Sequence, residues 1–131
     1  MRILIADDHP IVRRGVCSIL ESRKDLQVCA EASDGEEAVQ KAIELKPDAV
    51  ILDVTMPRLD GFQAAKRILE SLQVPILMLS MHDGDEMIRL AISVGAKGFI
   101  NKTAIVESLL TAVDIVMAGG TFFFRTVKNE Y

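Results

Sequence analysis

The sequence predicts an α/β protein in which five strands of one parallel sheet alternate with five helices, a (βα)5 arrangement. Strand-like apolar runs and amphipathic runs alternate five times along the 131 residues, without an internal repeat. One run, Ala49-Val50-Ile51-Leu52-Asp53, is apolar at every position before its final acid, which is typical of a strand covered by helices on both faces. Half of the residues are hydrophobic, which suffices for the core of a single domain.

The first two strands are predicted at Arg2 to Ala6 and at Leu26 to Ala32. Pro10 suits the first position of the intervening helix because its φ is already helical. Ser33-Asp34-Gly35-Glu36 has the pattern of a capping box and predicts the start of the second helix. The residues expected to face the core are Val12, Val16, Ile19 and Leu20 in the first helix, and Ala38, Val39, Ala42 and Ile43 in the second.

The second half of the chain repeats this alternation after Pro47 closes the second helix. Asp60 is expected to cap the third helix with Gln63 three residues later. Its buried stripe is Ala64, Ala65, Ile68, Leu69 and Leu72. The remaining elements are strands at Val74 to Leu79 and Gly98 to Asn101, and helices at Asp83 to Val94 and Ile105 to Ala118, the last ending at Gly119-Gly120.

Polar residues follow four of the five predicted strands. Asp7 and Asp8 follow the first strand, Asp53 ends the third, Ser80 follows the fourth and Lys102 follows the fifth. Right-handed crossovers and double winding bring the first and third strands side by side, so that their carboxyl ends meet at one edge of the sheet. We expect the three acids, the hydroxyl and the ammonium to converge there.

Three carboxylates in one crevice raise one another's pKa unless a cation accompanies them. Oxygen ligands of this kind suit Mg²⁺, with Mn²⁺ as an acceptable substitute. Asp53, alone at its strand end, is better placed for nucleophilic attack than the paired acids. A metal ion, Lys102 and Ser80 around it are the parts that stabilise a transferring phosphoryl group.

Each of these residues has a simpler interpretation when taken alone. Asp7-Asp8 is more often a solvated helix start, Ser80 a turn hydroxyl and Lys102 a surface charge, and only their combination favours a site. Phe99 alone would be a core residue. The two histidines, His9 and His82, lie near the same edge, but no third ligand supports a zinc site at either.

The motifs at these strand ends stand in the order of a known family, and the chain resembles the receiver domain of two-component response regulators over about residues 1 to 120. The fold implied is flavodoxin-like, with five parallel strands in the order 2-1-3-4-5. The motifs are Ala6-Asp7-Asp8-His9, the stretch from Leu52 to Gly61, Leu79-Ser80-Met81-His82 and the stretch from Gly95 to Lys102.

The resemblance implies a phosphoacceptor switch rather than an enzyme. Asp53 would accept a phosphoryl group from a sensor histidine kinase, and Lys102 would pair with that group. Ser80 would move toward the phosphoryl group, and rotation of Phe99 would change the output surface. The ligands implied for Mg²⁺ are Asp7, Asp8, Asp53 and the backbone carbonyl of Thr55.

The Ser80-Met81-His82 triplet and the ending Ala118 to Phe122 are most similar to the NarL/FixJ group, whose members carry a helix-turn-helix domain after the receiver. The implied role is control of transcription in the cytoplasm, with a phosphorylation-linked homodimer among the expected partners. We expect residues 121 to 131 to be the start of a linker or tail, with no DNA-binding domain in this chain. DNA would then be reached only through that missing domain.

Composition and local sequence narrow the remaining functions. A net charge of −4 without a basic block argues against DNA binding by this chain, and no apolar run approaches a membrane span. Cys17 and Cys29 lack metal-site spacing and are expected to be reduced, structural thiols. The apolar Phe122-Phe123-Phe124 should fold back onto the body or onto a partner subunit.

Three other functions compete with the switch. An interaction module controlled without phosphate, whether a stand-alone receiver or not, remains the alternative, although an intact site argues against it. A flavodoxin would need a phosphate-binding loop where Asp7-Asp8 repels phosphate. A haloacid dehalogenase type of phosphatase would need an acid at Thr55. Two departures from the usual receiver pattern are Asn101, where an apolar residue is usual, and Thr103, where many receivers have proline.

Overall fold

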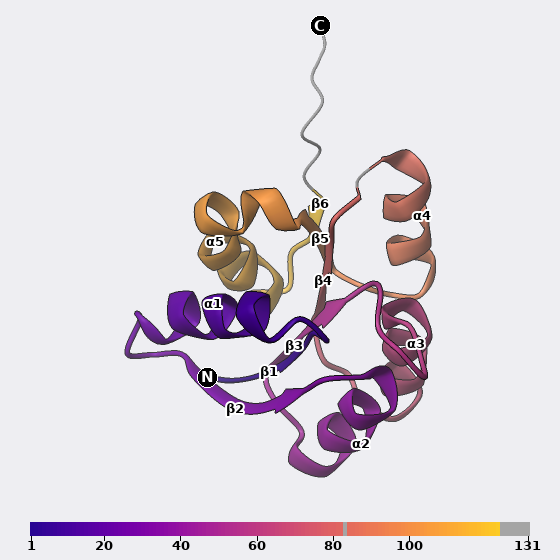
Figure 1. Cartoon of the computed structure of the whole chain (residues 1–131), viewed down its shortest axis with the longest axis horizontal. Coiled ribbons are helices and arrows are strands. Elements are labelled where there is room, and N and C mark those ends of the chain that lie inside the picture. The colour runs from indigo at the N-terminus through magenta and orange to yellow at the C-terminus, as the bar shows by residue number, and fades with distance from the viewer. Residues whose placement is uncertain (83, 124–131) are drawn as a thin grey trace, which may run out of the picture.

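The computed structural model describes residues 1–82 and 84–123 as three layers, with a parallel sheet between two layers of helices (Figure 1). Five strand–helix pairs follow one another as the alternation predicted, and a short strand comes after them. The elements are β1 (Arg2–Ala6), α1 (Pro10–Glu21), β2 (Gln27–Ala32), α2 (Gly35–Leu45), β3 (Ala49–Asp53), α3 (Gly61–Ser71), β4 (Ile76–Ser80), α4 (Asp85–Ser93), β5 (Gly98–Asn101), the 3₁₀ helix η1 (Lys102–Ala104), α5 (Ile105–Met117) and β6 (Phe122–Phe123).

The strand order in the sheet is β2-β1-β3-β4-β5-β6, which confirms the predicted order 2-1-3-4-5 and adds a sixth strand. β1 pairs with both β2 and β3, so the order reverses at β1. In open parallel sheets this reversal separates the loops on the two sides and leaves a crevice at the carboxyl ends of the strands. By this rule the crevice is expected between β1 and β3, where the acids were predicted.

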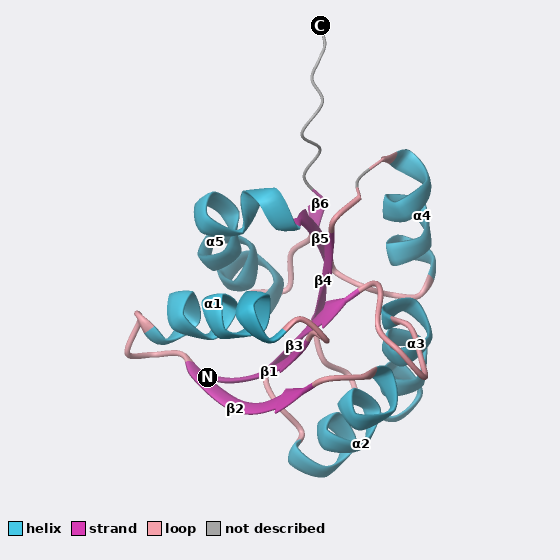
Figure 2. Ribbon diagram, in the orientation of Figure 1, coloured by secondary structure: helices cyan, strands magenta, loops and turns pink. Residues whose placement is uncertain are grey.

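Helices cover both faces of the sheet, with α1 and α5 on one face and α2, α3 and α4 on the other (Figure 2). The two faces have separate cores because each strand sends alternate side chains to opposite sides. The core under α1 and α5 includes Ile5, Leu20, Ile51, Leu79 and Leu109. The core under α2, α3 and α4 includes Leu4, Ala38, Leu52, Ile68 and Phe99.

β3 is buried at every position, as its unbroken apolar run predicted. The turn after it is held tightly against the end of the strand. The N–H of Gly61 donates to the Val54 carbonyl at 2.8 Å, and a Cβ at Gly61 would collide with the backbone carbonyl of Asp53. Asp60 caps α3, and its capping box with Gln63 is present as predicted. This close approach of α3 fixes the backbone that carries Asp53.

Some local predictions were wrong by small amounts. The cap of α2 is Asp34 rather than Ser33, and the Asp34 side chain accepts the N–H of Glu37 at 2.8 Å. Ile43, predicted to face the core, is exposed because it lies at the border of the apolar stripe of α2. Strand and helix bounds differ by up to two residues elsewhere, and Asp83, predicted to open the fourth helix, lies outside the described residues.

Both cysteines are free, as predicted for structural thiols. They are half-buried, Cys17 on α1 and Cys29 on β2. Burial, helped by the negative charge of Glu31, raises the pKa of the Cys17 thiol to about 11. The thiol is therefore protonated and a poor nucleophile at neutral pH.

The chain after α5 returns to the sheet as β6. Phe122 aligns with Gly98 and Phe123 with Phe99, and the Phe122 N–H donates to the Lys97 carbonyl at 2.8 Å. Phe122 packs on the core under α1 and α5, whereas Phe123 packs on the opposite core. The predicted fold-back onto the body is confirmed for these two rings. Phe124 lies outside the described residues.

Candidate phosphoacceptor site

The predicted site residues gather at the carboxyl end of the sheet. Asp7 follows β1, Asp53 ends β3, Ser80 ends β4 and Lys102 follows β5. The strand register places Asp53 opposite Leu79 and Ser80 opposite Asn101, so these residues lie at the same level across the sheet. The convergence expected from parallel topology is therefore present, and four strands contribute to it.

A buried ion-pair cluster forms the centre of this edge. The Lys102 ammonium lies 2.9 Å from Asp7 Oδ2 and 3.2 Å from Asp53 Oδ2. The Lys102 side chain is only 4% exposed, and the carboxyls of Asp7 and Asp53 are as deeply buried. A buried lysine is rare unless it is paired, and here one cation is shared between two acids.

Because Asp53 is buried and shares one ammonium with Asp7, the pKa of its carboxyl is shifted. Burial raises the pKa of its carboxyl to about 6, and the negative charge of Asp7 adds to the rise. The Lys102 ammonium and a hydrogen bond from the Thr55 backbone N–H act in the opposite direction and limit the rise. Asp53 is thus mostly ionised at neutral pH, but its charge is incompletely compensated, which is the condition of a carboxylate that gains from a further cation.

Lys102 is held in place by the residue before it. The Asn101 side-chain oxygen accepts the N–H of Thr103 at 2.9 Å and its hydroxyl at 2.8 Å, and so caps η1. The two departures from the usual receiver pattern therefore act on each other. The polar residue at 101 forms the cap that turns the chain directly after β5, at the point where Lys102 enters the site.

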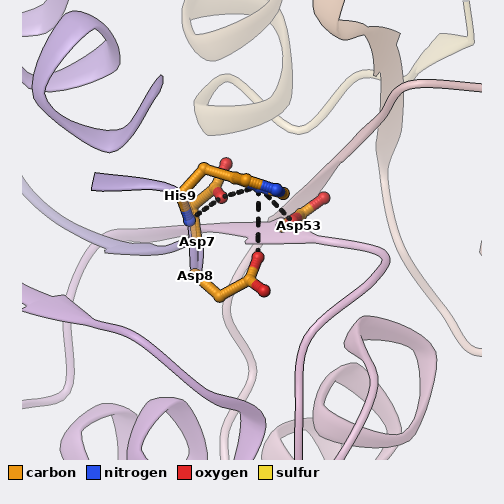
Figure 3. A group of neighbouring side chains, drawn as sticks. All are labelled: Asp7, Asp8, His9 and Asp53. Carbon is orange, nitrogen blue, oxygen red and sulfur yellow. Dashed lines mark hydrogen bonds and ion pairs between the residues drawn. The ribbon is translucent and has the colours of Figure 1, made fainter. Parts of the chain in front are cut away.

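His9 lies with the acids, although the sequence offered no third ligand that would support a zinc site at this histidine. Figure 3 shows its ring beside Asp7, Asp8 and Asp53. His9 Nδ1 lies 3.2 Å from an oxygen of Asp7, 3.2 Å from one of Asp8 and 3.9 Å from one of Asp53. The signal in the sequence was its position directly after two strand-end acids and before Pro10, which starts α1 at once.

The cluster has the composition of a metal site. One ligand atom from each of Asp7, Asp8, His9 and Asp53 lies within 4.8 Å of all the others. Among the described residues, Asp7 Oδ2, Asp8 Oδ1 and Asp53 Oδ2 are buried without a hydrogen bond. The first and third contact the Lys102 ammonium as ion pairs, yet three carboxylates still face one lysine. The residues therefore fit a divalent cation.

The other predicted residues lie at or near this edge. Ser80 is buried, and its hydroxyl oxygen accepts the backbone N–H of His82 at 3.0 Å. Phe99 is fully buried in the core under α4, between Met78 of β4 and Phe123 of β6 in the sheet register. Thr55 is exposed two residues beyond Asp53. Their roles in metal binding and switching stay predictions.

The comparison with protein families agrees with this geometry. The sequence model of the family described as the response regulator receiver domain matches residues 3–114. The chain therefore belongs to the response regulator receiver family. The residues matched include Asp7, Asp8, Asp53, Ser80 and Lys102.

The curated relatives that the chain resembles include oxygen regulatory proteins of staphylococci. The chain is 45% identical over 124 residues to the oxygen regulatory protein NreC of Staphylococcus haemolyticus, and 43% identical to NreC of Staphylococcus aureus. Each match covers 93% of this chain and 57% of the relative. The chain thus spans a little more than half the length of these curated relatives.

Solved structures with the same fold are also response regulators. A LuxR-family two-component response regulator from Aurantimonas sp. has a TM-score of 0.89 at 35% identity, with 92% of this chain and 87% of that chain covered. The receiver domain of the putative response regulator NarL from Mycobacterium tuberculosis has a TM-score of 0.86 at 33% identity, with 90% and 96% covered. The predicted similarity to NarL-type regulators is confirmed. Among the described helices, none has the length and apolar character to cross a bilayer.

Proposed function

We propose that Asp53 accepts a phosphoryl group from a phosphohistidine of a sensor histidine kinase and that the domain acts as a switch rather than as an enzyme. The observation that carries the proposal is the buried Lys102 ammonium shared by Asp53 and Asp7. That cation favours the charged form of the Asp53 carboxylate, and the same cation is available to a phosphoryl oxygen after transfer.

The transfer requires one bond to form and one to break. A carboxylate oxygen of Asp53 forms the new P–O bond, and the P–N bond of the donor breaks, with its electron pair returning to the donor imidazole. Lys102 is within reach of the phosphoryl oxygens because it already contacts Asp53 at 3.2 Å. No covalent role is needed from any other residue.

A divalent ion fits this reaction, Mg²⁺ first and Mn²⁺ as a substitute. The residues proposed to hold it are Asp7, Asp8, Asp53 and the backbone carbonyl of Thr55. When bound, the ion neutralises charge on the carboxylates and on the incoming phosphoryl group. The oxygens buried without hydrogen bonds on Asp7, Asp8 and Asp53 support this assignment.

The response is proposed to start at Ser80. The Ser80 hydroxyl oxygen now accepts a hydrogen bond from the backbone N–H of His82. If the hydroxyl is drawn to the phosphoryl group, this hydrogen bond breaks and the Phe99 ring can enter the space that the hydroxyl occupied. Phe99 is fully buried in this structure, so a rotation would change the surface formed by α4, β5 and α5.

That surface is proposed to act in the cytoplasm on a transcription-regulating DNA-binding domain and to support a phosphorylation-linked homodimer. The similarity to NarL and to a LuxR-family regulator supports the first part. DNA would be contacted by the regulator's other domain, since the chain has a net charge of −4.

Intact-mass spectrometry after exposure to acetyl phosphate and Mg²⁺ tests the proposal. We expect one phosphoryl group per chain, stable in acid and labile in base, and no gain in the Asp53→Asn variant. Asp60→Asn is the matched control, because it makes the same change at an acid of the same loop and asparagine still caps α3. Equal labelling of wild type and Asp53→Asn would refute the assignment, and an unlabelled wild type would favour the phosphate-independent interaction module.

A further inference from the structure

His9 lies where a ligand of the metal ion would lie. Its Nδ1 is 3.2 Å from Asp7 Oδ1 and 3.2 Å from Asp8 Oδ1. Two ligands in neighbouring positions around an octahedral ion, each about 2.1 Å from it, are about 3.0 Å apart. Both distances from His9 Nδ1 are therefore close to that spacing, and the contact of His9 with Asp53 at 3.9 Å brings the fourth residue to the same group (Figure 3).

The local chain holds the ring beside the acids, where its Nδ1 is hydrogen-bonded to Asp7 Oδ1. The backbone N–H of His9 donates to Asp7 Oδ1 at 2.8 Å, and Pro10 begins α1 immediately after it. His9 occupies the cap position of α1, but its side chain makes no capping hydrogen bond. The ring is 58% exposed, so an ion from solvent reaches it directly.

We propose that His9 supplies an imidazole nitrogen to the metal ion of the acid cluster and thereby sets which ion the site prefers. Carboxylate and carbonyl oxygens suit Mg²⁺ and Mn²⁺, whereas imidazole favours the later transition metals such as Co²⁺ and Ni²⁺. The affinity of mixed nitrogen and oxygen sites rises from Mn²⁺ to Co²⁺ and Ni²⁺. The inference rests on the proposed function in one respect, namely that the same acids hold a divalent ion.

The competing interpretation gives the opposite sign. If the ring only fills the place of the ion and hydrogen-bonds to the acids, every divalent ion must displace it, and removing the ring tightens the binding of all of them. If His9 is a ligand, removing the ring weakens the binding of Co²⁺ most, that of Mn²⁺ less, and leaves that of Mg²⁺ nearly unchanged. Ion affinities therefore distinguish the two roles without any measurement of phosphorylation.

The experiment is calorimetric titration of the 131-residue chain with Mg²⁺, Mn²⁺ and Co²⁺ chlorides. His9→Phe keeps a ring and removes the nitrogen, and His9→Asn replaces the nitrogen ligand with an amide oxygen. His82→Phe is the matched control, because His82 belongs to the same edge but not to the cluster. Thermal melts followed by circular dichroism confirm that each variant is folded.

For His9→Phe we expect the dissociation constant of Co²⁺ to rise at least about tenfold, and that of Mg²⁺ to change less than about twofold. The His9→Asn variant should also lose the preference for Co²⁺ over Mg²⁺. This second variant provides the test if His9→Phe does not fold. The visible absorption of bound Co²⁺ should change in both variants and stay as in wild type in His82→Phe.

Equal losses for all three ions, tighter binding of all of them, or an unchanged ratio would each overturn the proposal. A wild type that binds none of the ions would overturn both this proposal and the metal site of the proposed function. Ion selectivity that depends on His9 in a chain that acetyl phosphate does not label would support the role of His9 and refute the proposed function.

Discussion

The two halves of the sheet contribute different things to the site. β1 and β3 bring the acids Asp7, Asp8 and Asp53, whose backbones are fixed by the sheet and by tight turns. β4 and β5 bring Ser80, Lys102 and Phe99, and β6 extends this half. The acids are thus concentrated on one half of the sheet. The lysine that compensates their charge and the residues proposed to respond to phosphorylation lie on the other half. We therefore expect substitutions in the first half to alter the charge balance of the site. Substitutions in the second half should alter the packing and the response to phosphorylation.

The largest effect is expected where the two halves meet, at Lys102→Met. Removal of the buried ammonium leaves Asp7 and Asp53 uncompensated, and we expect the free energy of unfolding to fall by about 3 kcal/mol at neutral pH without metal. Urea unfolding measures it. Lys97→Met, at the exposed opposite end of β5, is the control and should stay within about 0.5 kcal/mol of wild type. Similar losses in both variants would show that the cluster contributes little.

The second effect concerns the charge of Asp53. Its pKa is raised to about 6 by burial and by Asp7, so the folded state binds this proton more tightly than the unfolded state does. That contribution to stability is complete below about pH 4 and is lost as the pH rises through about 6. Asp53→Asn cannot ionise and leaves Lys102 with Asp7 alone.

We therefore expect Asp53→Asn to exceed wild type in stability by about 1 to 2 kcal/mol above pH 7, after allowance for screening by solvent at the rim. The difference should vanish toward pH 4. Urea unfolding over this pH range, with a chelator present, measures it. A variant less stable than wild type at pH 8 would contradict the raised pKa.

The third effect tests β6 in the second half. Phe123→Ala removes a half-buried ring from the core that also contains Phe99, and we expect a loss of about 1 kcal/mol. Phosphoryl labelling by acetyl phosphate should be unchanged, because the ring is separated from the acids by β4 and β5. Urea unfolding and intact mass are the two readouts. A fall in labelling without a fall in stability would contradict the division between the halves.

The smallest effect on stability is expected for Ser80→Ala, which loses one hydrogen bond with the N–H of His82, about 1 kcal/mol or less. Labelling should persist, but hydrogen exchange of the segment around Phe99 should no longer change on phosphorylation. If wild type and Ser80→Ala respond alike, Ser80 has no part in the switch.

The sequence predicted the architecture and the acids because both depend on regular features. An alternation of apolar runs specifies a parallel sheet, and parallel topology then brings Asp7, Asp53 and Lys102 to one edge whatever their separation in sequence. Long, periodic elements were accordingly placed within one or two residues of their observed bounds.

What the sequence did not predict depends on short-range geometry. β6 has two residues, too few for a periodic pattern, and its pairing with β5 is a tertiary contact. The side chain of His9 points to the acids because of the way α1 begins, which residue spacing does not reveal. Asp34 and Ser33 are both good caps, and residue type and spacing alone do not decide that Asp34 is the one used.

The most direct test of the central claim is to locate the phosphoryl group. Borohydride converts an aspartyl phosphate to homoserine, and peptide mass spectrometry of the reduced protein identifies the residue. After labelling with acetyl phosphate and Mg²⁺, the account predicts homoserine at position 53 and unmodified aspartate at positions 7 and 8. Homoserine at either of those two positions, or at none, would contradict the assignment of Asp53 as the phosphoacceptor.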